Sequence, residues 1–333
     1  MNALRTVVVG LDFTPASRGA LRQASRIAAR NDAALHVVHA IEPSIVDEML
    51  ALVGLGRDQS WAAIRARARE LAQRLAEGDD AGRPGSGGVA VGAHIDVEVG
   101  SPMEVLCRAV RTHAADLLVL GVRSPTSAGR GAGPVAKACL RHAPTRVLLA
   151  REDQTGPYTS VVACTDFSET SFRAVETAVR IARFDKAALR IVHVAMPPGP
   201  GIDYTGDPLG LWPGQPVELV ESWNAYRASL GPRLEKFVEP LAAELSGVNA
   251  RLEIFEHGHY GRGIAAYAED HRADLLVLGA QGRSNLRYAL LGSTAERALS
   301  ELSCSALVVK PAGIATDPSE AVVAEVDPVR SLL

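Results

Sequence analysis

An internal repeat constrains the fold of this chain more than any other feature. The segment "VVVGLDFTPASRGALRQASRIAARNDAALHVVHA", from Val7, aligns without gaps to "VVACTDFSETSFRAVETAVRIARFDKAALRIVHV", from Val161. Further along, "ADLLVLG" ending at Gly121 recurs as "ADLLVLG" ending at Gly279. A chain of 333 residues is long enough for two domains, so each repeat is expected to form one.

The seam between the repeats is the polar stretch "REDQTGPYTS", which glycine and proline interrupt. We predict a first domain over residues 1–150, a linker over 151–157 and a second domain over 158–312. The tail over 313–333 is expected to be disordered.

Within each repeat, apolar β-branched runs such as "TVVVGL" and "DLLVLG" alternate with helical patterns such as "ASRGALRQASRIAAR". Strands that are apolar throughout are buried on both faces, which indicates a mostly parallel sheet with helices on both sides. The sequence therefore predicts an α/β protein: two tandem, open, doubly wound, Rossmann-like sheets of five strands, each in the order 3-2-1-4-5.

The segment between the second and third strands is long in both repeats. In the first, "WAAIRARARELAQRLAEG" predicts a helix over residues 61–78. In the second, the proline- and glycine-rich residues 197–216 predict an irregular surface loop.

Composition excludes several classes of protein. The formal net charge of −3, without basic clusters, argues against a nucleic-acid partner. No apolar stretch is long enough to span a membrane, and the first residues lack a signal-peptide core, so we expect a cytoplasmic protein. The four scattered cysteines are expected to be buried free thiols.

The segment "GAQGRSNLRYALLGST", residues 279–294, is the clearest candidate for a binding motif. Ligands of open parallel sheets bind beyond the carboxyl ends of the strands, where the strand order reverses. Asp166 ends one strand at that crevice and Gly279 ends its neighbour. Glycines let backbone approach a ligand, and a helix that starts at Ser293 would offer free amides to an anion such as phosphate.

A purely structural alternative stays open at this point. The sequence "STAE" from Ser293 to Glu296 is also a capping-box pattern, which satisfies a helix start without any ligand. The glycines can equally serve turns alone.

Together with "VVACTDFS" and "ALRIVHV", the spacing G-x2-G-x9-G-S-T resembles the universal stress protein family. The resemblance covers about Leu4 to Pro311 and implies a tandem member with a regulatory role in stress. It implies ATP as ligand, with Mg²⁺ accompanying the phosphates. The residues that it implies for nucleotide binding are Asp166, His193, Val194, Gly279, Gly282, Gly292, Ser293 and Thr294.

The first repeat departs from this motif. Aligned on Gly121, it has Ser124 at the position of Gly282, Pro134 at that of Gly292 and Val135 at that of Ser293. Proline has no amide hydrogen and valine has no hydroxyl, so we expect the first site to be impaired. Asp12 is expected to cap a turn.

Other polar groups have weaker claims. Arg283 and Arg287 are candidates for pairing with phosphates. Glu256, His257 and His259 could supply metal ligands, but neighbouring side chains on opposite faces of a strand do not easily reach one ion, so a surface or dimer-contact role is favoured.

The sequence has no Walker phosphate loop and no nucleophile elbow. We therefore expect a binding protein with at most slow ATPase activity. Two alternatives stay open: a tandem scaffold that binds no nucleotide, and a phosphohydrolase or adenylyl-transferring enzyme.

The last strands of the two repeats, near Val147 and Val308, would be exposed apolar edges if left unpaired. We predict that the repeats pack on each other through these strands as a pseudo-dimer. The family resemblance further implies that two chains pair into a homodimer.

Overall fold

The computed structural model describes residues 4–44, 57–77, 92–122, 132–197, 217–282 and 291–311. These residues form two compact units. The first unit holds the described residues up to 156 together with 291 and 305–311, and the second holds 157–282 and 292–304. The predicted tail over 313–333 and almost all of the predicted loop over 197–216 lie outside the described residues.

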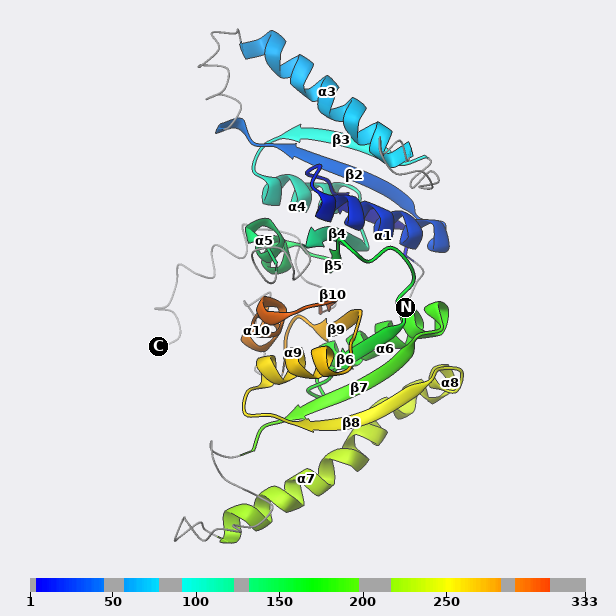
Figure 1. The fold of residues 1–333 in the computed structure, drawn as a ribbon, viewed down its shortest axis with the longest axis vertical. Coiled ribbons are helices and arrows are strands. Elements are labelled where there is room, and N and C mark those ends of the chain that lie inside the picture. Colours follow the sequence, from blue (N-terminus) through cyan, green and yellow to red (C-terminus); the bar gives the residue numbers. More distant parts are fainter. Residues whose placement is uncertain are drawn as a thin grey trace, which may run out of the picture. The chain divides into compact units, whose positions relative to one another are not determined.

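The first unit contains a sheet with the strand order β3-β2-β1-β4-β5-β10 (Figure 1). Its first five strands are parallel to one another. The elements are β1 (Thr6–Gly10), α1 (Pro15–Asn31), β2 (Ala34–Ile41), α3 (Arg57–Glu77), β3 (His94–Val99), α4 (Pro102–Thr112), β4 (Leu117–Val122), α5 (Pro134–His142), β5 (Arg146–Arg151) and β10 (Ser305–Val309).

The second unit repeats this arrangement with the parallel strand order β8-β7-β6-β9. Its elements are β6 (Ser160–Cys164), α6 (Glu169–Asp185), β7 (Ala188–Ala195), α7 (Val217–Val238), the 3-10 helix η1 (Glu239–Leu241), α8 (Ala242–Leu245), β8 (Ala250–Glu256), α9 (Tyr260–Asp270), β9 (Leu275–Gly279) and α10 (Ser293–Glu301).

Both units have the predicted α/β architecture. Val7, Val8 and Val9 of β1 are fully buried, as are Leu275, Leu276 and Val277 of β9, because helices cover both faces of each sheet. In the first unit α1 packs on β1 and β4, while α4 packs on β2. Right-handed crossovers place these two helices on opposite faces, since the chain runs outward from β1 to β3 and then back to β4.

The strands near Val147 and Val308 pair with each other, as predicted. β10 runs antiparallel to β5, with Val308 opposite Val147, and both side chains are fully buried. The hydroxyl of Ser305 also accepts a hydrogen bond from the amide of Arg151 at 3.1 Å. The last strand of the second repeat thus completes the sheet of the first unit and covers an apolar edge. A homodimer of two chains stays a prediction.

The long segments between second and third strands differ from expectation in one respect. The helix predicted over residues 61–78 is confirmed as α3. The sequence predicts no helix over Val217–Val238, where the structure has α7. Its interior Pro232 and the proline-rich segment before it concealed the helical pattern.

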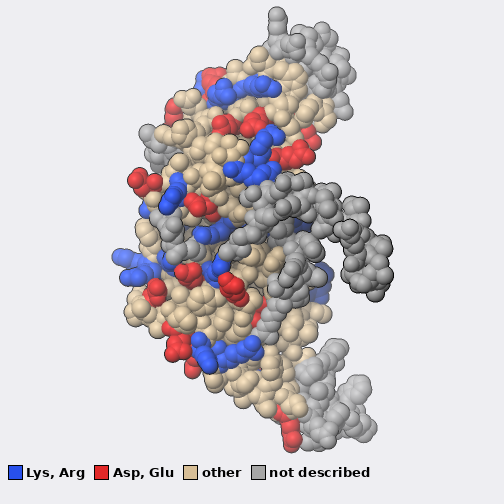
Figure 2. Space-filling model, turned by 180° about the vertical axis from the view of Figure 1, so that it is seen from behind, with Lys and Arg blue, Asp and Glu red and all other residues tan. Residues whose placement is uncertain are grey.

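No helix within the described ranges is long and apolar enough to cross a membrane. On the face drawn in Figure 2, acidic and basic side chains are interspersed over the described surface.

We expect the β5–β10 pairing to contribute to stability. Val308→Ala removes two buried methyl groups and should lower the free energy of unfolding by about 2 kcal/mol or more, from lost burial and an unfilled cavity. Val135→Ala is the matched control, because Val135 is 38% exposed and its truncation should change stability by less than about 0.5 kcal/mol. Urea denaturation followed by circular dichroism measures both, and equal effects would contradict the buried pairing.

Candidate functional site

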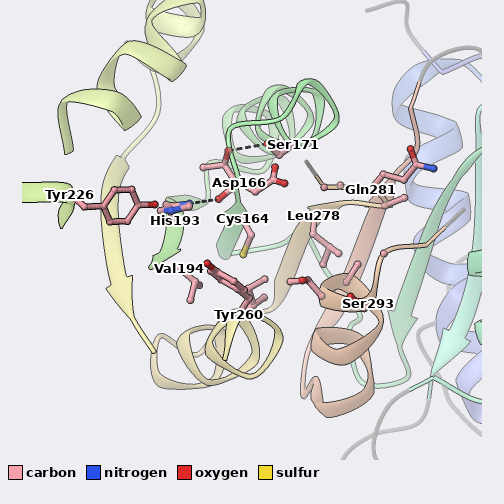
Figure 3. Close-up of a pocket in the computed structure, with 18 residues that line it drawn as sticks. Cys164, Asp166, Ser171, His193, Val194, Tyr226, Tyr260, Leu278, Gln281 and Ser293 are labelled. Carbon is pink, nitrogen blue, oxygen red and sulfur yellow. Dashed lines mark hydrogen bonds between the residues drawn. The ribbon is translucent and has the colours of Figure 1, made fainter. Parts of the chain in front are cut away.

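A cavity of about 340 Å³ opens at the carboxyl ends of the strands in the second unit (Figure 3). Parallel pairing of β6 with β9 sets Val161 opposite Leu275 and Ala163 opposite Val277. The residues that follow both strands therefore meet at one edge of the sheet. A volume of about 300 Å³ or more is typical of small-molecule sites in proteins.

Most of the residues predicted from the sequence line this single cavity. Arg283 and Arg287 lie outside the described residues, as does Ser124 of the first repeat. The predicted residues that the structure brings together are Asp166, His193, Val194, Gly279, Gly282, Gly292, Ser293 and Thr294.

Asp166 is held by the start of the helix that follows it. One carboxylate oxygen, Oδ1, accepts a hydrogen bond from the amide of Ser168 at 3.0 Å. The other oxygen, Oδ2, lies against the glycine loop: a Cβ atom on Gly282 would be only 2.7 Å from it. Glycine at 282 thus allows the loop backbone to approach the carboxylate. The predicted approach of this backbone to a ligand stays a prediction.

His193 is 7% exposed, and its hydrogen bonding fixes its tautomer. Its Nδ1 donates to the carbonyl oxygen of Thr165 at 2.8 Å, so in the neutral ring the proton is on Nδ1. The ring of Phe167 packs against the imidazole with centroids 4.5 Å apart. Phe167 adopts the left-handed φ of 65°, which is uncommon for a residue other than glycine.

The first repeat has the same arrangement after its first strand. His39 Nδ1 donates to the carbonyl of Leu11 at 2.7 Å, and Phe13 has a φ of 62° beside it. Asp12 caps a turn as predicted, accepting hydrogen bonds from the amide and hydroxyl of Thr14. Burial raises the pKa of Asp12, but hydrogen bonds from Ser17 and Thr14 outweigh burial and hold it below its ordinary value.

The capping-box alternative for residues 293–296 is wrong. The N-cap of α10 is Gly292, and no side chain caps the helix. Ser293 is already the first helical residue, so its hydroxyl and that of Thr294 are not used as caps. The amide of Gly292 donates to the carbonyl of Ala280 at 2.6 Å, which ties the helix start to the strand end. The first-turn amides that follow have no partner inside the helix.

The alignment of the first repeat at this helix needs a correction. The N-cap of α5 is Gly133, which corresponds to Gly292, and Pro134 is the first helical residue. Pro134 therefore matches Ser293 and Val135 matches Thr294. The alignment on Gly121 had set Pro134 against Gly292 and Val135 against Ser293. The reason is that the connection after Gly121 is one residue shorter than the one after Gly279.

In the corrected alignment, too, the start of α5 lacks groups that the start of α10 has. The first repeat keeps its N-cap glycine but lacks both hydroxyls and one first-turn amide. Proline at the first helical position is compatible with a helix start, since that amide has no helical partner.

Sequence reasoning missed two aromatic residues at the cavity. Tyr226 of α7 and Tyr260 at the start of α9 line it and are 42% and 45% exposed. Tyr226 comes from a helix that was not predicted. Tyr260 lies in "EHGHY", where the two histidines are the residues that suggest a metal site.

The histidines of that segment do not form a metal site within the described residues. His257 Nδ1 lies 3.0 Å from the amide nitrogen and 2.9 Å from the carbonyl oxygen of His259, and Glu256 pairs with Arg227. Their predicted role at the surface is consistent with the exposure of His259.

Asp166 carries the one carboxyl group among the described residues that line the cavity, and no lysine or arginine is among them. Thr165 and Ser171 add two hydroxyl groups to the cavity lining, and their oxygens lie 3.0 Å apart. An anionic group in this cavity would therefore meet backbone amides and hydroxyls rather than basic side chains of the described part. Such donors are found at helix N-termini that bind anions.

The sequence matches a protein family model twice. The model of the universal stress protein family covers residues 3–151 and again residues 157–310. A universal stress protein of Methanocaldococcus jannaschii is 33% identical over 157 residues, which are 46% of this chain and 82% of the relative. One of Mycolicibacterium smegmatis is 25% identical over 318 residues, 92% of this chain and 97% of the relative.

Solved structures show the same fold at low sequence identity. A universal stress protein from Archaeoglobus fulgidus DSM 4304 superposes with a TM-score of 0.61 at 17% identity, covering 92% of this chain and 98% of that chain. A protein of unknown function from Pseudomonas aeruginosa PAO1 has a TM-score of 0.57 at 20% identity, with 93% of each chain covered.

Two matched substitutions test the helix starts. Ser168 is the N-cap of α6 and its hydroxyl accepts from the amide of Ser171 at 3.2 Å, so Ser168→Ala should cost about 1 kcal/mol of stability. Ser293→Ala should change stability by less than about 0.5 kcal/mol, because Ser293 caps nothing. Thermal denaturation without nucleotide compares the two, and an equal loss at Ser293 would support the capping box.

Proposed function

We propose that this chain, which belongs to the universal stress protein family and carries two of its domains in tandem, binds ATP in its second domain. Family membership places it among stress-response proteins, and we infer a regulatory role in which the occupied and empty forms present different surfaces. One observation carries the proposal: Asp166, the glycines and the uncapped start of α10 line one cavity.

The nucleoside end of the ligand is assigned to Asp166 and the residues near it. A carboxylate only accepts hydrogen bonds, so Asp166 suits the hydroxyl donors of a ribose and would repel a phosphate. Val194 is 5% exposed and lines the cavity beside His193, which supports an apolar border for adenine. The exposed rings of Tyr226 and Tyr260 add aromatic surface at the same cavity.

The phosphates are assigned to the glycine loop and the start of α10. There the first-turn amides and the hydroxyls of Ser293 and Thr294 offer donors, and the positive end of the helix dipole favours an anion. Arg283 belongs to the same proposal as a cation near the phosphates. Mg²⁺ would bind through phosphate oxygens with few protein ligands, as is usual for this ion.

The residues that line the cavity favour a protein that binds ATP over an enzyme that hydrolyses it rapidly. Asp166 is the one carboxylate among the described lining residues, and its Oδ1 is engaged by the amide of Ser168. A general base must reach the attacking water, and no second carboxylate lines the described cavity to assist. Any ATPase activity is therefore expected to be slow, and turnover well above one per minute that is lost in Asp166→Ala would favour the enzyme alternative.

Nucleotide carried by the purified protein decides between the binding and scaffold hypotheses. The full-length chain is denatured, and the released small molecules are identified by mass analysis. Adenine nucleotide released near one per chain is expected. Its absence, together with no binding of added ATP and magnesium, would favour a scaffold.

The corrected alignment defines a sharper test of the phosphate end. Ser293→Pro with Thr294→Val copies Pro134 and Val135 of α5 into α10, removing one amide hydrogen and both hydroxyls. Hydrogen bonds to a charged group contribute roughly 1.5 to 3 kcal/mol each, so affinity for ATP should fall at least tenfold in calorimetric titration with magnesium.

The matched control is Pro134→Ser with Val135→Thr, which should leave the second site unchanged. Both variants should fold, since each copies a helix start that the other repeat accommodates, and circular dichroism checks this. Unchanged affinity in the folded α10 variant would show that the phosphates bind elsewhere.

A further inference from the structure

A cluster of imidazoles and one carboxylate lies where β2, β3 and the end of α4 meet, near the amino ends of the two strands; Figure 1 labels these three elements. His36 is in β2, His94 and Asp96 are in β3, and His113 is the C-cap residue of α4. The strand register sets His36 opposite His94 and Val38 opposite Asp96, so these side chains share one face.

Three atoms of this cluster converge. Asp96 Oδ2 lies 3.5 Å from His36 Nδ1 and 3.4 Å from His113 Nε2. All three ligand atoms lie within 4.8 Å of one another. Ligands bound tetrahedrally at 2.0 to 2.2 Å from a Zn²⁺ ion are separated by about 3.4 Å, so both distances to Asp96 fit a shared ion.

The packing around the cluster orients the two ligand rings. The imidazoles of His36 and His113 stack with centroids 3.7 Å apart and planes tilted by 23°, and His94 stacks beside His36 at 4.9 Å. Each ring places one nitrogen within 3.5 Å of the same carboxylate oxygen. The positions of the nitrogens are set by strand and helix packing rather than by a loop.

Two of the converging atoms are buried without a hydrogen bond. His36 Nδ1 and Asp96 Oδ2 are both inaccessible and have no hydrogen-bond partner among the described residues. Unsatisfied buried polar atoms cost free energy, and folded proteins generally pair them. The side chains of His113 and Asp96 are 27% and 36% exposed, which gives an ion a route from solvent.

The second repeat has different side chains at the positions that correspond to this cluster. Arg190 aligns with His36. Glu253 lies at the position in β8 that corresponds to Asp96 in β3. His271 is the C-cap residue of α9, as His113 is that of α4. Arg190 Nε lies 3.6 Å from Glu253 Oε1, and His271 Nε2 lies 4.0 Å from Glu253 Oε2. A guanidinium thus supplies permanent positive charge to the carboxylate in the second unit.

The first unit has imidazoles in place of that guanidinium. Asp96 Oδ2 therefore faces two imidazole nitrogens instead of a permanently charged guanidinium. A bound cation would supply the missing charge.

We propose that His36, Asp96 and His113 form a binding site for a divalent transition-metal ion of the Zn²⁺ type. Two imidazole nitrogens and one carboxylate oxygen suit zinc and similar metals rather than Mg²⁺ or Ca²⁺, which prefer oxygen ligands alone. Three protein ligands leave a coordination position for water. The ion would join β2, β3 and α4, and the proposal does not depend on nucleotide binding in the second domain.

The test uses the full-length chain, freed of metal by a chelator and dialysed against Zn²⁺, with bound zinc measured by mass spectrometry. One ion more per chain is expected in the natural protein than in His36→Arg, a substitution that copies Arg190. His113→Ala should likewise weaken this binding at least about tenfold. His271→Ala is the matched control in the second unit and should keep it.

Cobalt(II) provides a second measurement, because its visible spectrum reports its ligands. A spectrum of nitrogen and oxygen ligands, without sulfur-to-metal charge transfer and absent from His36→Arg, is expected. Zinc bound equally by the natural chain and a folded His36→Arg variant, or loss of the same ion in His271→Ala, would overturn the proposal. So would failure of the natural chain to bind zinc, or a cobalt spectrum of thiolate ligation.

Discussion

The parallel pairing of β6 with β9 is the constraint on which the candidate site depends. Backbone hydrogen bonds between these strands fix where each one ends, and the chain segments that follow both strands must share the space at that edge. They fit there because the glycines at these positions carry no side chain. A Cβ atom on Gly279 would lie 3.1 Å from Thr170, and one on Gly282 would lie 2.7 Å from Asp166.

The two repeats keep this framework and differ in the groups attached to it. Both place a histidine against the carbonyl that follows the first strand, and both hold the intervening phenylalanine in a left-handed conformation. At the start of the fourth crossover helix, however, one repeat has hydroxyls and the other has Pro134 and Val135. At the amino ends of the strands, His36 replaces Arg190. The proposed division of labour, nucleotide in one domain and a metal ion in the other, rests on these few exchanges.

Pairing of β10 with β5 ties the end of the second repeat into the sheet of the first unit. All five residues of β10 are buried, and the strand would otherwise present unpaired amides and carbonyls along an apolar edge. An antiparallel partner satisfies those groups. The chain between Gly292 and Cys304 nevertheless stays with the second unit, so α10 and the candidate site are kept there.

The sequence by itself determined the repeat, the strand order, the apolar strands and the residues of the glycine motif, because all of these depend on local composition and on an alignment of the chain with itself. It also identified Val147 and Val308 as edges that need a partner. Its errors were local. The helix of residues 217–238 was hidden by proline, and a one-residue difference in loop length shifted the alignment of Pro134.

Only the tertiary structure decided which atoms meet. That Gly292 rather than Ser293 caps α10 depends on a hydrogen bond to Ala280, across a loop whose path the motif does not specify. That His36, Asp96 and His113 converge depends on strand register and on the packing of α4, which join positions far apart in the chain. Spacing along a sequence reports periodicity within one element, whereas distances between elements are set by how whole sheets and helices pack.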